Sequence, residues 1–212
     1  MKKEWKSFRE MFEAMNQNVN YVILRNYEFL GQEKLDKRHA DLDILCDNKE
    51  EMISLTGAKP WDQIDDGIRY AVKINNQRIH MDIREIGDGY YDRHWQRAML
   101  KKRTLFLDSF YVMDEENYFY SLTYHALIQK THVSSDYQKM LVAFAKKFDI
   151  YVNRVSELKT YLFRYMKQKR YYVTCAKSGI YIINFKNIPL ALLRINPYFY
   201  LQAKIKEFKT YL

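Results

Sequence analysis

Hydrophobic residues recur along the first half of the chain at two different spacings. Apolar side chains three and four residues apart predict an amphipathic helix over residues 4–16. Tyr21–Leu24 is a short apolar run typical of a buried strand, and Asp41–Cys46 alternates with a period of two, which is typical of a half-buried strand. Two further strands are predicted at Ile68–Ile74 and Arg78–Arg84, joined by a polar turn. The other elements expected here are a helix over residues 49–55 capped by Asn48, a helix over residues 90–101 and an extended segment over residues 104–112.

The second half of the chain has a helical pattern instead. Leucine, phenylalanine and tyrosine at helical spacing predict three helices, followed by a short hairpin and a basic amphipathic tail. These segments are Asp114–Lys130, Asp136–Asn153, Ser156–Lys169, Tyr171–Thr174 with Ile180–Phe185, and residues 194–212. The predicted fold class is therefore α+β: a mixed sheet with flanking helices in residues 1–112, followed by a mostly helical domain in residues 113–212.

Composition and charge narrow the class of protein. Hydrophobic residues make up 48% of the chain and charged residues 29%, which is typical of a globular protein. The net charge of +9 indicates an anionic partner, although a lysine-rich composition of the kind found in AT-rich genomes explains it equally well. Cys46 and Cys175 are far apart and in no ligand spacing, so neither a disulfide scaffold nor a zinc site is expected.

Neither a signal peptide nor a transmembrane helix is predicted. The N-terminal residues have no apolar core region, and the apolar stretch Ile180–Leu201 is interrupted by lysine, arginine and proline. We therefore expect a cytoplasmic protein. The basic tail, with Lys204, Lys206 and Lys209 among aromatic residues, either packs on the helical half or lies on the inner face of the membrane as a peripheral contact.

Three aspartates form the candidate chemical site. Asp41 and Asp43 are two residues apart in one strand and therefore project from the same face. Asp82 lies in the middle of a second apolar strand, with His80 and Arg84 on its face. If the two strands are neighbours, the three carboxylates converge, and they repel one another unless Mg²⁺ or Mn²⁺ neutralises them. The alternative is that Asp41 and Asp43 are only the solvent-facing side of an amphipathic edge strand.

These motifs resemble the nucleotidyltransferase superfamily, which has the fold of DNA polymerase β. The similar parts are an apolar strand and turn ending in Arg25-Asn26, the D-x-D strand His39–Leu45, and the third aspartate in Ile79–Ile83. The chain is similar to uncharacterised bacterial nucleotidyltransferase-like proteins, often associated with surface-polysaccharide or antibiotic-type chemistry. Arg38 before the D-x-D and the histidine-containing segment Tyr118–Lys130 add to the resemblance, which spans roughly residues 18–130.

The resemblance implies an Mg²⁺-dependent transferase that moves a nucleotidyl or phosphoryl group from a nucleoside triphosphate to a small hydroxylated acceptor, with a role in surface-polysaccharide biosynthesis. It implies Asp41, Asp43 and Asp82 as the catalytic and metal-binding residues. The residues expected to contact the nucleotide are Arg25, Asn26, Arg38 and Arg84.

Arg25-Asn26 stands where active members of the superfamily have a Gly-Ser turn that admits the triphosphate. Either the Arg25 guanidinium replaces backbone donors on a phosphate, or the nucleotide site is altered or lost. Two other functions remain open. One is a non-catalytic binding module of the same fold. The other is a nucleic-acid-modifying transferase, which the net charge favours but for which the sequence offers no separate basic patch or RNA motif.

Overall fold

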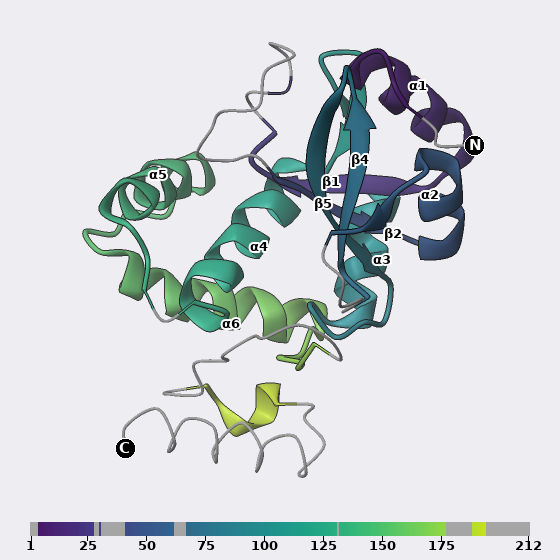
Figure 1. Ribbon diagram of the computed structural model, residues 1–212. Helices are drawn as coiled ribbons and strands as arrows, with labels where there is room; N and C mark the ends of the chain where they lie inside the picture. The colour runs from purple at the N-terminus through teal and green to yellow at the C-terminus, as the bar shows by residue number, and fades with distance from the viewer. Residues whose placement is uncertain are drawn as a thin grey trace, which may run out of the picture. The chain divides into compact units, whose positions relative to one another are not determined.

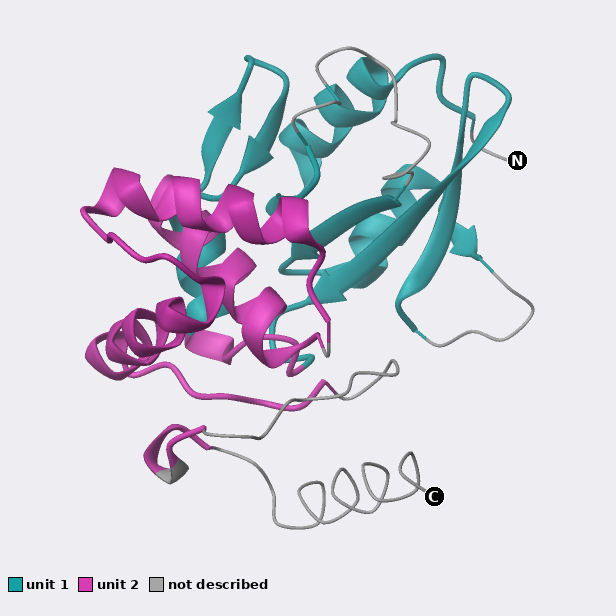
Figure 2. Ribbon diagram, turned by 90° about the vertical axis from the view of Figure 1, so that its left-hand side faces the viewer, with its two compact units in different colours: residues 1–88, 95–114 teal, residues 89–94, 115–212 magenta. Residues whose placement is uncertain are grey.

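The computed structural model describes residues 4–27, 30, 41–61, 67–130, 132–176 and 188–193 (Figure 1). Arg38, the second strand of the predicted hairpin at residues 180–185 and the basic tail lie outside the described residues. The chain forms two compact units (Figure 2): unit 1 is residues 1–88 with 95–114, and unit 2 is residues 89–94 with 115–212. The predicted α+β class is confirmed, because unit 1 contains a mixed sheet and unit 2 is mostly helical.

In the described part of the chain, unit 1 is built on a sheet of seven strands with the order β3-β4-β5-β2-β1-β7-β6. The central strand β2 pairs in parallel with β5 and antiparallel with β1. This agrees with the nucleotidyltransferase-like sheet that the resemblance implies. The strands are β1 (Tyr21–Arg25), β2 (Asp41–Cys46), β3 (Lys59–Pro60), β4 (Arg69–Ile74), β5 (Gln77–Glu85), β6 (Thr104–Phe106) and β7 (Phe110–Val112).

One face of this sheet is apolar and packs against helices. Leu42, Ile44, Met81 and Ile83 are fully buried on it, because they alternate with the polar residues of β2 and β5. Helix α1 (Phe8–Asn18) adds its own apolar stripe, and its Phe12 ring lies 4.8 Å from the Phe110 ring of β7. Helices α2 (Lys49–Thr56), capped by Asn48 as predicted, and α3 (Arg93–Lys101) complete the helices of this unit. The second face of the sheet carries the aspartates.

Unit 2 is held together by an aromatic and leucine core. Its helices are α4 (Glu115–Ile128), α5 (Ser135–Ala145) and α6 (Leu158–Lys169), with short 3₁₀ turns η2 (Lys146–Phe148), η3 (Val155–Glu157) and η4 (Leu190–Leu192). Tyr120 of α4 stacks on Tyr165 of α6, with ring centroids 3.8 Å apart. Residues 89–94 belong to this unit because their backbone and side chains bond to it; Gln129 Nε2, for example, donates to the carbonyl of Tyr90 at 2.7 Å.

The structure corrects several expected boundaries. The segment 104–112 is a tight hairpin rather than one extended strand, with Leu107 and Asp108 both in the left-handed conformation at its turn. The helix expected over 136–153 ends at Ala145, and Asp149 takes a left-handed conformation after η2. Residues 171–174 form no regular strand; Val173 makes a single parallel bridge with Leu193. No helix in the described part of the chain is both long enough and apolar enough to cross a membrane.

Candidate active site on the central strands

Asp43 and Asp82 lie side by side at the middle of the sheet. The parallel register of β2 and β5 pairs Asp43 with Asp82 and Asp41 with His80. Side chains that are paired across neighbouring strands lie on the same face, so all three aspartates share one face, as predicted. Because β2 is the fourth of seven strands, the alternative of a solvent-facing edge strand is wrong. The exposed fraction of the Asp43 side chain is only 1%.

A β-bulge brings Arg25 onto this face. In β1 the register passes from Ile23 opposite Ile44 to Arg25 opposite Asp43, so one extra residue is inserted between them. A bulge of this kind turns a side chain that would otherwise point elsewhere. The Arg25 guanidinium therefore forms a short ion pair with Oδ1 of Asp43. Sequence alone could not reveal this contact, because no residue type marks the bulge.

The turn after β1 keeps one property of the Gly-Ser turn that it replaces. Asn26 has a φ of 57°, in the left-handed region that glycine adopts most easily and asparagine tolerates better than other residues. Arg84 lies two residues after Asp82 on the same face of β5; its guanidinium is 1% exposed and pairs with Asp88 at 3.2 Å, and its charge lowers the pKa of Asp43. Asp88 also accepts a hydrogen bond from Nε2 of Gln96 at 2.7 Å.

His80 lies beside Asp82, on the strand face where the sequence analysis had placed it, and Trp61, which was not among the predicted site residues, packs against His80. Nε2 of His80 lies 3.3 Å from Oδ1 of Asp82, and the His80 ring lies 4.7 Å from the Trp61 ring. The Arg78 guanidinium lies over the same indole ring, 4.3 Å from its centroid. The alternation of β5 places Arg78 and His80 on the aspartate face, but no pattern in the sequence indicated Trp61.

The surroundings of Asp43 on this face disfavour the ionised form of its carboxyl group. Burial raises the pKa of Asp43 from 3.8 to about 6; Arg25 opposes the shift, while Asp41 and Asp82 add to it. The contact with Asp82 raises the pKa of His80 above its ordinary value, against the effect of burial. Within the described residues, Oδ2 of Asp43 is buried and has no hydrogen-bond partner. An anionic oxygen in this position requires a cation or a donor.

The described residues fit a divalent cation in part. Asp43 and Asp82 provide two neighbouring carboxylates, and one buried oxygen of Asp43 is left for a ligand because Arg25 holds the other. Carboxylate oxygens are the ligands that Mg²⁺ and Mn²⁺ prefer. No three histidine, cysteine or carboxylate side chains in the described ranges are grouped closely enough to form a complete ligand set.

Comparisons with known proteins add little to this geometry. No protein-family model matches the chain, and no curated protein matches it. The solution structure of the antibiotic-resistance factor ANT(2'')-Ia is similar over 76% of this chain and 91% of its own, with 12% sequence identity and a TM-score of 0.41. A TM-score this low does not establish a common fold, so the similarity carries no inference about function.

Proposed function

We propose that unit 1 is a divalent-metal-dependent transferase domain that moves a nucleotidyl or phosphoryl group to a small hydroxylated acceptor. The proposal rests on one observation above all: a buried carboxylate oxygen of Asp43, without a hydrogen-bond partner among the described residues, beside Asp82 on the neighbouring strand. A protein maintains such a costly arrangement where a ligand relieves it, and perturbed carboxylates of this kind cluster at functional sites.

In this proposal Asp43 and Asp82 hold the metal ion, and Asp41 on the same face adds negative charge that attracts it. The bound ion would supply positive charge to the phosphate oxygens. Arg25 holds Asp43 in place, and its positive charge would add to that of the ion beside a bound phosphate. Asp82 accepts the proton of the acceptor hydroxyl as the hydroxyl oxygen bonds to phosphorus. With a nucleoside triphosphate as donor and nucleotidyl transfer, the bond from the α-phosphorus to its bridging oxygen breaks and pyrophosphate leaves.

Titration calorimetry with each nucleoside triphosphate, with and without Mg²⁺, tests the proposal. The wild type should bind a triphosphate only when Mg²⁺ is present, and Asp43→Asn should lose this Mg²⁺-dependent binding. Asp108→Asn is the matched control, because it removes one carboxylate charge from a hairpin turn away from the site. If no triphosphate binds in the presence of the metal, the transferase proposal is wrong.

A non-catalytic binding module is the second candidate. The ion pair between Arg25 and Asp43 favours it, since a guanidinium already neutralises the carboxylate that the metal would need. The two candidates differ in the same titration. A module of this kind would bind a phosphorylated ligand equally well with and without Mg²⁺, and Asp43→Asn would change that affinity little.

A further inference from the structure

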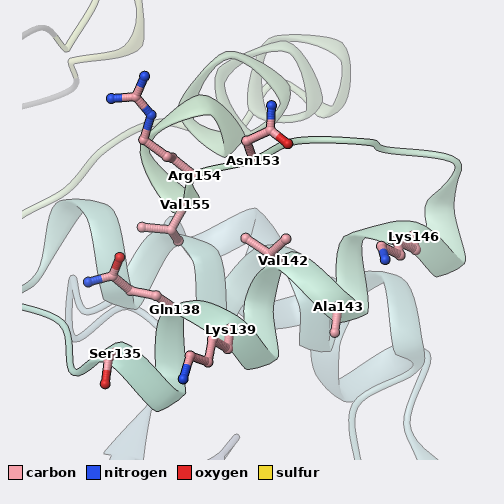
Figure 3. A pocket seen from close by; sticks show the side chains of 9 residues that line it. All are labelled: Ser135, Gln138, Lys139, Val142, Ala143, Lys146, Asn153, Arg154 and Val155. Atoms are coloured by element: carbon pink, nitrogen blue, oxygen red, sulfur yellow. The ribbon is translucent and has the colours of Figure 1, made fainter.

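Unit 2 has a basic groove that shares no residue with the aspartate face and has no role in the proposed transfer. It lies between α5 and residues 153–155 and has a volume of about 420 Å³; we call it the α5 groove (Figure 3). Val142 and Val155 lie between the helix and the loop and form an apolar floor, and the basic side chains among the lining residues, Lys139, Lys146 and Arg154, form its rim.

The segment of the chain that contains this groove is strongly basic. Residues 132–176 contain nine lysines and arginines against three aspartates and glutamates, so this segment carries +6 of the net charge of +9. Among the described residues that line the α5 groove, none is acidic. Arg154 is only loosely paired: its Nε lies 3.8 Å from Oε1 of Glu157, and its side chain is 83% exposed. The rim is therefore available for an anionic ligand.

The arrangement of the rim favours an extended anion over a compact one. Lys139 and Lys146 are seven residues apart, which along a helix is about 10 Å. Figure 3 shows the charged ends of the three rim residues well apart from one another, so they do not converge on a single phosphate. A chain of several phosphates can contact all three in turn.

The shape and the nearby side chains indicate which polyanion fits. A flat lipid surface cannot enter a hollow, whereas a flexible strand can place a base or sugar on the apolar floor. Tyr151, two residues before Asn153 of the groove lining, is 73% exposed, and exposed aromatic residues together with basic ones are typical of proteins that stack unpaired bases.

We propose that the α5 groove binds single-stranded nucleic acid, with phosphates on Lys139, Lys146 and Arg154 and a base on the apolar floor. The test is fluorescence anisotropy of a labelled 12-nucleotide oligouridylate with the full chain over a range of salt concentrations. Each phosphate contact to a single strand contributes about 0.7 to the slope of log affinity against log salt. Lys139→Gln/Lys146→Gln/Arg154→Gln should therefore lower that slope by about 2 and weaken binding about a hundredfold at 0.1 M salt.

The control variant removes the same charges elsewhere. Lys101→Gln/Lys167→Gln/Arg164→Gln also replaces two lysines and one arginine, all exposed and none lining the α5 groove. It should keep most of the affinity. Tyr151→Ala, which leaves the charge unchanged, should weaken binding about fivefold.

Three results would overturn the proposal. The first is equal affinity of the groove variant and the control variant. The second is displacement of the oligonucleotide by pyrophosphate at concentrations near the dissociation constant of the oligonucleotide, which would identify a site for a compact anion. The third is binding to vesicles containing phosphatidylserine without binding to the oligonucleotide. Because all substituted residues are on the surface, thermal unfolding curves will verify that each variant is folded. The outcome is independent of whether unit 1 transfers a nucleotidyl group.

Discussion

Replacing Asp43 by asparagine is expected to stabilise the protein at neutral pH, although the change removes one partner of an ion pair. The pKa of Asp43 is raised from 3.8 to about 6, mainly by burial, and this shift already includes the favourable effect of Arg25. A pKa difference of roughly 2 units corresponds to about 3 kcal/mol. At neutral pH the ionised carboxylate of Asp43 destabilises the folded state by this free energy. Asparagine has nearly the same shape and no charge, so it removes this cost.

The sign of the pH dependence follows from proton binding. Between about pH 4 and pH 6 the folded state binds a proton on Asp43 that the unfolded state has already lost. The free energy of unfolding of the wild type therefore falls as the pH rises through this window and then levels off. In Asp43→Asn this fall is absent. Comparing the two proteins at each pH largely cancels the titration of His80, whose pKa is raised by Asp82.

Urea denaturation from pH 4 to pH 8 measures the effect. The two proteins should have similar stability at pH 4, and the variant should be more stable by about 3 kcal/mol above pH 7. Asp108→Asn is the control for the loss of one charge and should follow the wild type. An Asp43→Asn variant that is less stable than the wild type by the same amount at every pH would refute the reasoning, because the ion pair with Arg25 would then be net stabilising.

Three further predictions concern the metal and the backbone. Mg²⁺ at ten times its dissociation constant should stabilise the wild type by about 1.4 kcal/mol in the same denaturation assay, and it should leave Asp43→Asn unchanged. Arg25→Met should destabilise the protein by about 3 kcal/mol at pH 8 and by less at pH 5, where Asp43 is protonated; equal losses at both pH values would contradict the pairing. Gly89→Ala should cost more than about 3 kcal/mol in thermal unfolding, since the new Cβ would clash with the Cys175 carbonyl oxygen. Gly67→Ala, with a similar positive φ but only an ordinary contact of 3.8 Å to Nζ of Lys49, should cost about 1 kcal/mol.

The central strands could be predicted because their sequence and their environment agree. In β2 the alternation of aspartate with leucine and isoleucine reflects a strand with one apolar and one polar face, and its predicted bounds Asp41–Cys46 are those observed. The cap at Asn48 was predictable for the same reason, because its side chain accepts a hydrogen bond from the N–H of Glu51 within a few residues. Local chemistry determines both features.

The remaining features of the site depend on contacts between distant segments. The register that places Asp43 beside Asp82 joins strands 39 positions apart, and the bulge that turns Arg25 inward adds a residue without any glycine or proline to mark it. The hairpin at residues 107–108 has non-glycine residues in the left-handed conformation, so its turn has no sequence signal. Trp61 reaches His80 only because β3 and β4 bring it across the sheet. Such contacts are set by tertiary packing, which local patterns do not encode.

The state of Asp43 explains why Arg25 does not make a metal ion unnecessary. Arg25 pairs with Oδ1 of Asp43 and leaves Oδ2 buried without a hydrogen-bond partner among the described residues. The pKa of Asp43 is raised to about 6 although Arg25 and Arg84 oppose the shift, so these guanidinium groups do not compensate fully for its burial beside Asp41 and Asp82. A bound cation would provide the missing partner of Oδ2, and a divalent ion attracts neighbouring carboxylates more strongly than a monovalent ion does. On this argument the Arg25-Asn26 turn complements the metal ion instead of replacing it, and titration with Mg²⁺ and with K⁺ at equal ionic strength should show stabilisation by Mg²⁺ alone.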